Sequence, residues 1–375
     1  MKKIFMFTSV HNWNDTRIFY KEAVSLAKKY EVELHAPADF DFKEENSVKI
    51  YGLPRWYKVS ERKKIRKEIW QRINKTDADI FHFHDPELVF MGMLLKIFKK
   101  KKVIYDIHEN YYTSILLKKW IPTKYLRKIV ALLFSFIEKF SCSFFDAIIF
   151  AEIYYKNNFS NKHIMKSVDV LNYPLLKKIE SKKSKDNVTK IIYTGGVTVE
   201  RGTINMINGV KELIKRKINA KLYLVGYLND ENIISIIENN TKLNENVVII
   251  GKREFVDRLV IDKEYLSADI GLALISSKEH YEKKLLTKFF EYMQNQIPII
   301  ISNYQNWEKL INETNCGLCV DPLNPKEIAD AIEYIINNPE IAKQMGKNGR
   351  KAVEEKFNWK NEEKKLFKIY KEILK

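Results

Sequence analysis

The chain has 375 residues, of which 45% are hydrophobic and 30% are charged, with only 12 glycines and 9 prolines. This composition excludes collagen-like and disordered chains, and the length favours two globular domains. The formal net charge of +17 favours contact with phosphates in nucleotides, nucleic acids or anionic lipids, although a lysine-rich composition alone can also produce it.

In the first half of the chain, short apolar runs alternate with amphipathic helical patterns. Strands separated by helices form βαβ units, which build a parallel sheet. The expected strands span residues 4–9, 32–36, 80–84, 102–107 and 147–151, and the expected helices span residues 17–29, 86–98 and 123–145.

The alternation stops in a polar, lysine-rich connector between residues 173 and 188 and then starts again. The connector predicts a domain boundary, with a first domain over residues 1–175 and a second over residues 188–357. The expected strands of the second half span residues 190–193, 221–225, 247–250, 270–275, 297–302 and 317–320, and the expected helices span residues 204–216, 287–295, 325–338, 341–357 and 360–374.

The predicted fold class is therefore α/β, with two Rossmann-like, doubly wound domains that face each other across a cleft. Ligands of such sheets bind beyond the carboxyl ends of the strands, so the residues just after each strand are the candidates for function.

The turn after the first predicted strand contains His11, Asp15 and Arg17. Asp15 precedes the first predicted helix, where a side-chain oxygen can cap the free backbone amides. We expect His11 and Arg17 to face the cleft.

Histidines gather at the ends of two further strands of the first domain. His82 and His84 alternate along one strand and should point to one face, and Asp106, His108 and Glu109 end the next strand. An imidazole there can donate a hydrogen bond to a phosphate or sugar oxygen. Packing is the alternative role, but three of the seven histidines lie in these two motifs, which favours function. No Cys/His ligand set accompanies them, so we expect no metal.

The second domain opens with a strand that runs into Gly195 and Gly196, followed by Arg201 and Gly202 at the start of a helix. Glycines let the backbone approach a phosphate, and a helix N-terminus offers free amides and a favourable dipole. Arg201 can add a bidentate contact to a diphosphate. The alternative is a plain tight turn.

Lys288 and Glu291 are three residues apart, so they share one face of a predicted helix. The carboxylate can accept hydrogen bonds from ribose hydroxyls, and the lysine can neutralise a phosphate. An ordinary surface ion pair is the alternative reading of this spacing.

The three cysteines, Cys142, Cys316 and Cys319, indicate a reducing compartment rather than a disulfide scaffold. The Cys-x-x-Cys pair runs into a predicted strand instead of opening a helix, so we expect it to pack rather than to carry out redox chemistry. No signal peptide or membrane span is expected, which predicts a cytoplasmic protein.

Taken together and in order, these pieces resemble bacterial, retaining glycosyltransferases of family 4 (glycosyltransferase group 1), which have the two-domain GT-B fold. The resemblance covers nearly the whole chain. Its carriers are the motifs at residues 9–18, 84–88, 105–109, 172–174, 193–196, 201–202, 268–271, 288–293, 321–322, 348–350 and 357–359, together with Gly226, Gly251, Pro298 and Gly317.

The resemblance implies a role for each matching residue. Glu291 would bind the donor ribose, Arg201 and Lys288 would hold the diphosphate, and His108 would lie near the transferred sugar and its leaving phosphate. Further donor-binding positions would be Gly195, Gly196 and Gly226, the acceptor side would consist of His11, Asp15, Arg17, His84, Asp85 and Glu109, and a helix over residues 358–375 would return to the first domain.

Two positions depart from the family pattern. Lys283 stands where the family often has a carboxylate that contacts the donor sugar, with Glu282 one place away. Gly195-Gly196 stands where the family often has Gly-Arg, so one cationic contact to the diphosphate is missing unless Lys288 supplies it.

The implied activity is transfer of a hexosyl or N-acetylhexosaminyl group from a UDP- or GDP-linked sugar, without a metal, to a glycan or lipid-linked acceptor in the synthesis of capsule, lipopolysaccharide or another cell-surface polysaccharide. One alternative is a nucleotide-sugar 2-epimerase of the same fold, with Asp106 and Glu109 as acid and base. A nucleic-acid-binding protein is disfavoured because no binding motif occurs and the lysines are dispersed.

Basic and large apolar residues are interleaved at residues 96–103 and 117–145 of the first domain. This mixture suits a peripheral position on an anionic membrane surface, but an apolar stripe that packs on the sheet explains it equally well. The polar and aromatic members of the second stretch include Lys118, Lys119, Trp120, Lys124, Arg127 and Lys128.

Overall fold

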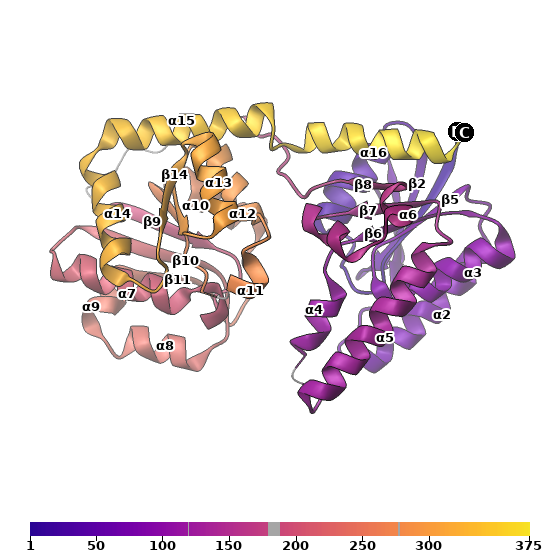
Figure 1. Cartoon of the computed structure of the whole chain (residues 1–375), viewed down its shortest axis with the longest axis horizontal. Coiled ribbons are helices and arrows are strands. Elements are labelled where there is room, and N and C mark those ends of the chain that lie inside the picture. Colours follow the sequence, from indigo (N-terminus) through magenta and orange to yellow (C-terminus); the bar gives the residue numbers. More distant parts are fainter. Residues whose placement is uncertain (119, 179–187, 277) are drawn as a thin grey trace. The chain divides into compact units, whose positions relative to one another are not determined.

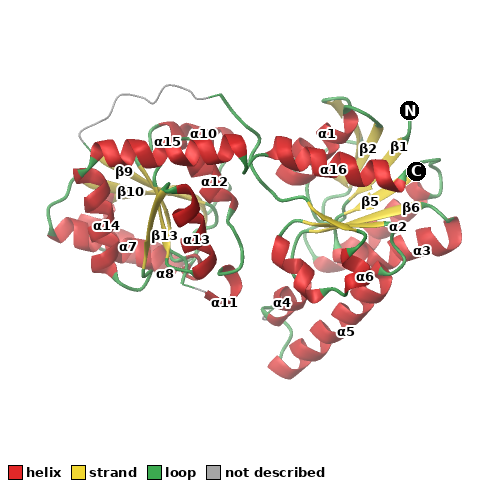
Figure 2. Ribbon diagram, turned by 45° about the horizontal axis from the view of Figure 1, so that its top comes forward, coloured by secondary structure: helices red, strands yellow, loops and turns green. Residues whose placement is uncertain are grey.

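Two mainly parallel sheets, one in each half of the chain, organise the computed structural model (Figures 1 and 2). The structure describes residues 1–118, 120–178, 188–276 and 278–375. Its first compact unit consists of Met1–Asn172 and Trp359–Lys375, and its second consists of Tyr173–Asn358. Most of the predicted connector, residues 179–187, lies outside the described residues.

The first unit has an eight-stranded sheet in the order β3-β4-β2-β1-β5-β6-β7-β8. All neighbouring strands are parallel except β3, which pairs antiparallel with β4. The strands are β1 (Lys3–Phe7), β2 (Glu31–Pro37), β3 (Phe42–Glu45), β4 (Val48–Leu53), β5 (Ile80–Phe83), β6 (Lys102–Ile107), β7 (Ala147–Phe150) and β8 (Ser167–Asp169).

Alternate residues of β1 pack into different cores, because successive side chains of a strand point to opposite faces. Ile4 and Met6 pack beneath η1 and α16, whereas Phe5 and Phe7 pack with α2, α3 and α5. The helices of this unit are η1 (Thr16–Ala23), α1 (Val24–Ala27), η2 (Val59–Glu61), α2 (Arg62–Ile73), η3 (Pro86–Leu88), α3 (Val89–Lys99), α4 (Tyr111–Leu116), α5 (Lys124–Cys142), η4 (Ile153–Asn158), α6 (Asn161–Ile164) and α16 (Trp359–Ile373).

The C-terminal helix α16 belongs to the first unit, although it follows the second unit in the chain (Figure 1). Trp359 donates from Nε1 to Ser25 Oγ at 2.9 Å, and the backbone amide of Leu171 donates to Glu362 Oε2 at 2.8 Å. Leu366 and Tyr370 are fully buried against the sheet. The helix therefore completes one of the two cores of this unit.

The second unit has a six-stranded sheet in the order β11-β10-β9-β12-β13-β14, and all neighbours are parallel. The strands are β9 (Thr189–Thr194), β10 (Ala220–Leu228), β11 (Val247–Lys252), β12 (Ile270–Ala273), β13 (Ile299–Ser302) and β14 (Gly317–Val320). The helices are η5 (Val199–Arg201), α7 (Thr203–Lys215), α8 (Glu231–Glu238), α9 (Thr241–Asn246), α10 (Arg258–Leu266), α11 (Lys278–Tyr281), α12 (Thr287–Gln294), α13 (Gln305–Thr314), α14 (Pro325–Asn337) and α15 (Pro339–Glu355).

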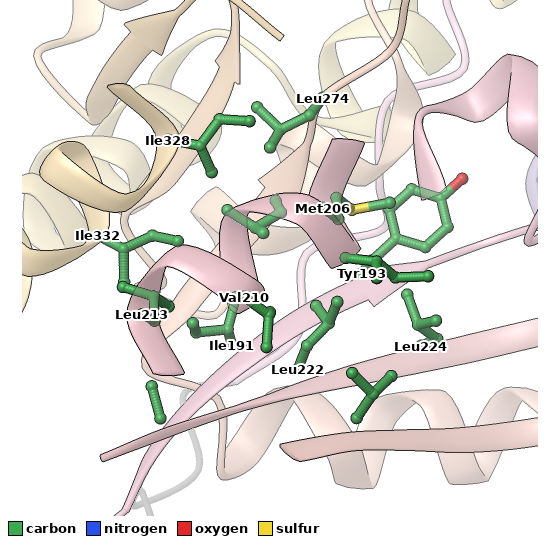
Figure 3. Close-up of a cluster of buried hydrophobic side chains, with 14 of the residues drawn as sticks. Ile191, Tyr193, Met206, Val210, Leu213, Leu222, Leu224, Leu274, Ile328 and Ile332 are labelled. Carbon is green, nitrogen blue, oxygen red and sulfur yellow. The ribbon is translucent and has the colours of Figure 1, made fainter. Parts of the chain in front are cut away.

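Figure 3 shows the core on one face of this sheet, where α7 and α14 pack against β9 and β10. Tyr193 of β9 and Met206 of α7 are both fully buried there, close to the carboxyl end of β9. This packing fixes the strand that leads into Gly195 and Gly196.

The cysteines of the Cys-x-x-Cys pair lie just before and within β14, and both are free thiols. Burial raises the pKa of Cys316 to about 11 and that of Cys319 to about 12, so neither forms a ready thiolate. This agrees with the expected packing role.

Candidate functional site

Each sheet has one point at which the strand order reverses, and the candidate residues follow the strands at these points. In the first unit the reversal lies between β1 and β5, and in the second it lies between β9 and β12. Loops that leave neighbouring strands in opposite directions open a crevice at such a point, which is where ligands of doubly wound sheets bind.

In the first unit, Asp85 joins the loop after β5 to the loop after β1. Its Oδ2 accepts hydrogen bonds from Thr8 Oγ1 at 2.7 Å and from the backbone amide of Ser9 at 2.6 Å. The carboxylate is almost completely buried, so it fixes the backbone from which His11 projects.

Asp15 caps the first helix, as the sequence predicts. Its Oδ1 accepts hydrogen bonds from the backbone amides of Arg17 at 2.8 Å and Ile18 at 2.9 Å. Its Oδ2 lies 3.4 Å from His11 Nδ1. Burial opposes the charged imidazole, but the hydrogen bond to Asp15 and the charges of Asp85 and Asp15 outweigh it and raise the pKa of His11 to about 8. His11 is therefore cationic at neutral pH.

A buried ionic cluster lies beneath these loops. Arg17 donates from Nε to Asp106 Oδ2 and from Nη2 to Asp106 Oδ1, both at 3.0 Å, and its Nη2 is also 3.0 Å from Glu22 Oε1. Burial would raise the pKa of Asp106, but Arg17 and His108 hold it well below its ordinary value. Burial raises the pKa of Glu22 well above its usual range, although Arg17 opposes this. The cluster thus holds one stable anion, Asp106, against one guanidinium.

His108 is connected to this cluster through one ring nitrogen. Its Nε2 lies 3.0 Å from Asp106 Oδ2 and 3.2 Å from His84 Nδ1. Because Asp106 is ionised and can only accept, Nε2 carries the proton and donates to it. This tautomer leaves Nδ1 as the nitrogen that can meet a ligand.

The structure divides the six residues expected on the acceptor side into two groups. Arg17, His84 and Asp85 are 4%, 0% and 1% exposed, so they cannot face an acceptor directly as expected, and they instead support the residues above them. Burial is the physical reason, because the Arg17 guanidinium lies inside the unit, where it pairs with Asp106 and contacts Glu22. The residues with accessible side chains are His11, Asp15 and Glu109.

Among the described residues, Glu22, His82, His84 and Asp106 form a buried group whose ligand-type atoms lie within 4.8 Å of one another. Its chemistry resembles that of a metal-binding set, and the sequence did not reveal it because Glu22 comes from η1. However, the Arg17 guanidinium already contacts both carboxylates, so it supplies the positive charge that the group requires. The expectation that the site needs no metal stays a prediction.

In the second unit, Arg201 and Lys288 flank Gly195. The backbone of Gly195 has a φ of +118°, and a Cβ placed on it would lie 3.4 Å from Lys288 Nζ and 3.5 Å from Arg201 Nη1. Only glycine leaves the space between the two cations open at this conformation. Gly196 lies next to the Arg201 guanidinium, and Gly226 packs its backbone directly against the carbonyl of Gly195.

Lys288 is buried, and within the described part of the chain its Nζ has no hydrogen-bond partner and no ion pair. The ammonium lies 3.7 Å from the centre of the Tyr193 ring. Burial lowers the pKa of Lys288 well below its ordinary value, and the charge of Arg201 lowers it further. This arrangement differs from the surface ion pair considered above and leaves the amine ready for an anion.

Glu291 lies on α12, one turn after Lys288, and faces α10. Arg258 Nη1 forms an ion pair with its Oε1, and Tyr265 donates from its hydroxyl to Oε2 at 2.8 Å. Each carboxylate oxygen has a second lone pair, so both can also accept hydrogen bonds from vicinal hydroxyls. The sequence does not reveal the role of Arg258, because no motif in the residues around it connects it with Glu291.

The second unit therefore offers two cations beside an open backbone turn and a fixed carboxylate on the same helix as one of them. Among the described residues, no carboxylate forms an ion pair with either Arg201 or Lys288. Such a set can bind an anion such as a diphosphate together with a group that carries hydroxyls. Lys283, which stands where the resemblance leads us to expect a carboxylate, is exposed and does not belong to this set of residues.

Two family models match most of the chain. "Glycosyltransferase Family 4" matches residues 17–170, and "Glycosyl transferases group 1" matches residues 176–352. The two matches thus fall on the sequence of the first unit and on that of the second.

Individual proteins show the same similarity. An uncharacterized glycosyltransferase of Methanocaldococcus jannaschii is 25% identical over 95% of this chain and 93% of its own. The capsular polysaccharide biosynthesis glycosyltransferase CapM of Staphylococcus aureus is 27% identical over 53% of this chain and 50% of its own. The crystal structure of HepE from Anabaena in complex with UDP superimposes with a TM-score of 0.70 and 12% identity, covering 99% of this chain and all of the other.

Proposed function

Because the chain belongs to the group 1 and family 4 glycosyltransferases, we propose that it moves a hexosyl or N-acetylhexosaminyl group from a nucleotide-diphosphate sugar to an acceptor, with retention of configuration. We propose a UDP- or GDP-linked donor, and the similarity in fold to HepE, whose structure holds UDP, supports UDP. The similarity to CapM supports an acceptor in cell-surface polysaccharide synthesis.

The observation that carries this proposal is the pair of cations around Gly195. A buried lysine amine that lacks a carboxylate partner is costly to keep charged. A bound anion beside the amine lowers this free-energy cost. A diphosphate supplies this charge, and Glu291 lies three residues further along α12 to accept the ribose hydroxyls.

The same cations can accelerate transfer. As the bond between the sugar C1 and the phosphate oxygen breaks, negative charge grows on the leaving diphosphate and the sugar becomes oxocarbenium-like. Arg201 and Lys288 therefore stabilise the transition state more than the bound donor. In front-face attack the acceptor hydroxyl forms the new bond to C1, and its proton passes to the departing phosphate. We propose that these two side chains take over the charge stabilisation for which other enzymes use a metal.

His108 is proposed to contact the transferred sugar through Nδ1, while Asp106 holds the opposite nitrogen. The 2-epimerase alternative needs Asp106 as an acid or base. Asp106 is fully buried and accepts hydrogen bonds from Arg17 and His108, so it cannot approach a sugar, and we propose transfer instead.

The experiment that tests this function measures release of free nucleotide from a panel of UDP- and GDP-sugars, with and without glycan acceptors. For the donor that is used, Arg201→Ala and Glu291→Ala are each expected to lower kcat/KM by a factor of ten or more, on the order of 1.4 kcal/mol. Arg216→Ala is the matched control, because Arg216 ends the same helix that Arg201 precedes and pairs with Asp330 and Glu333. Wild-type kinetics in both test variants would show that the donor site lies elsewhere.

We also propose that the first unit works at an anionic membrane surface, through the outer face of α5. Of its 19 residues, α5 buries only Ala131, Glu138, Ser141 and Cys142. The apolar stripe is thus largely exposed rather than packed on the sheet, and such patches mark interaction surfaces. None of the helices in the described part of the chain combines the length and apolar character needed to span a bilayer. The exposed apolar residues of α5 are Tyr125, Leu126, Ile129, Leu132, Leu133, Phe136, Ile137 and Phe140.

Charge favours an anionic lipid surface as the partner of this face. Lys118, Lys124 and Lys128 are exposed near the start of α5, whereas Lys119 lies outside the described residues. Each cation near an anionic membrane contributes about 1 kcal/mol, and the apolar side chains add their burial in the interface. The neighbouring helix α3 also has exposed apolar side chains, those of Phe90, Ile97 and Phe98.

The measurement is sedimentation with vesicles of increasing anionic lipid content at low and high salt. Binding is expected to rise with anionic content and to fall at high salt, and Phe136→Glu is expected to weaken it at least tenfold. Leu323→Glu is the matched control, because Leu323 in the second unit is also 70% exposed. A wild-type protein that stays in the supernatant at every anionic fraction at low salt would contradict the proposal.

A further inference from the structure

A pocket of about 250 Å³ lies within the first unit between α4, α5 and η4, and we call it the α4–α5 pocket. The two residues that flank His108 in the sequence, Ile107 and Glu109, both line it. Tyr155, on the opposite wall, donates from its hydroxyl to the backbone carbonyl of His108 at 3.1 Å. The pocket therefore adjoins the loop that carries His108.

One face of α5 forms the inner wall of this pocket. Leu132, Ser135 and Glu138 follow one another at intervals of three residues, so they share a face of the helix. Leu132 also belongs to the exposed apolar face described above, since its side chain is 52% exposed. At this residue the pocket and the apolar surface are continuous.

The lining has the mixed chemistry that a sugar ring requires. Tyr111 and Tyr155 present aromatic surface, and Glu109 and Glu138 present carboxyl oxygens that can accept hydrogen bonds from hydroxyls. Glu138 accepts a hydrogen bond from the Tyr105 hydroxyl at Oε1, at 3.0 Å, and its Oε2 has no hydrogen-bond partner among the described residues. Burial raises the pKa of Glu138 to about 7, so near neutrality this group can donate as well as accept.

We propose that the α4–α5 pocket binds one sugar ring of a glycolipid acceptor, whose lipid lies along the exposed face of α5. This assignment rests on the proposed transfer reaction. The pocket has room for a single ring rather than for an oligosaccharide, and its apolar margin at Leu132 leads towards the proposed membrane surface. A soluble glycan would gain nothing from that margin, which is why a glycolipid is the better fit.

The test uses the full-length protein without any donor and a panel of octyl hexosides and octyl N-acetylhexosaminides, each paired with its methyl glycoside. Saturation-transfer NMR reports separately on the sugar protons and the alkyl protons of each probe. We expect sugar protons of at least one octyl glycoside to be saturated, with affinity at least tenfold higher than for its methyl partner.

Ser135→Phe fills the pocket from α5, and Ser135→Ala is the matched control that leaves it open. We expect Ser135→Phe to lower the affinity for the octyl glycoside at least tenfold and to abolish saturation of the sugar protons, while alkyl contacts remain. Ser135→Ala should stay within threefold of the wild type. Equal saturation of sugar protons in Ser135→Phe, equal affinity for octyl and methyl glycosides, or no saturated sugar protons in the wild type would each overturn the proposal.

Slow release of nucleotide from the donor sugar, without acceptor, separates this inference from the proposed function. It is expected to be unchanged in Ser135→Phe, because Arg201, Lys288 and Glu291 belong to the other unit. A protein that releases nucleotide normally but does not bind the glycosides contradicts the pocket alone. Glycoside binding without turnover of any nucleotide sugar contradicts the proposed function alone.

Discussion

Replacing Lys288 by methionine is expected to raise the dissociation constant for the nucleotide diphosphate about 10- to 100-fold, or about 1.4–2.8 kcal/mol. The amine is buried and lies beside Gly195, where a diphosphate would be its partner. The same change is expected to leave the melting temperature unchanged or to raise it, because a buried ammonium without a carboxylate partner destabilises the fold. Calorimetric titration with UDP and GDP and thermal unfolding of the free protein measure both effects.

Lys190→Met is the matched control for this prediction. Lys190 also lies over a tyrosine ring, that of Tyr223, but it is hydrogen-bonded to Glu264 and to Ser267 Oγ. Its loss should reduce stability and spare nucleotide binding, which is the opposite pattern. If Lys288→Met instead unfolds more easily and binds nucleotide like the wild type, Lys288 has a packing role.

The depressed pKa of Lys288 also fixes the sign of two pH effects. Because its pKa is lower in the folded than in the unfolded protein, the unfolded chain holds more protons between the two values, and stability rises with pH in that window. A bound diphosphate raises the pKa of the amine, so binding takes up protons there and weakens as the pH rises. Both effects should vanish in Lys288→Met.

His108→Ala is expected to lower kcat about 100-fold while the affinity for the nucleotide changes less than twofold. In the proposed role the Nδ1 lone pair accepts from a hydroxyl of the transferred sugar, and loss of a contact that positions the reacting group typically has an effect of this size. The ionic cluster beneath it should persist, because Arg17 still contacts Asp106 and Glu22. Single-turnover kinetics with the matched donor, together with nucleotide titration, separate the two quantities.

His163→Ala serves as the control, because His163 is a buried histidine of the same unit whose ring contacts Ser143 and Ser160. It should keep the wild-type kcat. An equal loss of turnover and nucleotide affinity in His108→Ala, or a large drop in its melting temperature, would contradict a direct role in transfer.

Much of the fold could be predicted because buried parallel strands leave strong local signals. The predicted strand at residues 102–107 and the one at residues 317–320 agree with β6 and β14. The β3–β4 pair was missed. Phe42–Glu45 is exposed and charged and pairs antiparallel at the edge of the sheet, and Val48–Leu53 alternates buried with half-buried residues instead of forming a continuous apolar run. The segment predicted as a helix over residues 17–29 consists of a π-helix followed by a short α-helix, which side-chain periodicity does not distinguish.

The candidate site could be predicted only where a residue type follows a strand or shares a helix face with another. Arg201, Lys288 and Glu291 met these conditions. The partners that define their surroundings did not. Arg258 reaches Glu291 only through the tertiary fold, and Glu22 meets Arg17, five residues before it, because both lie on a π-helix rather than on an α-helix. Sequence also could not decide which side of α5 is covered, since an amphipathic pattern does not reveal whether a second layer lies against it.

The position of α16 has a consequence for how the chain acquires its structure during synthesis. This helix completes a core of the first unit, yet the ribosome produces it only after the whole second unit. Until then Ile4, Met6 and His82 lack the helix that covers them in the finished protein. The second unit can thus fold on the ribosome before the first is finished. Until α16 leaves the exit tunnel, the first unit remains incomplete, and this face of its sheet is open to chaperones or to non-native contacts.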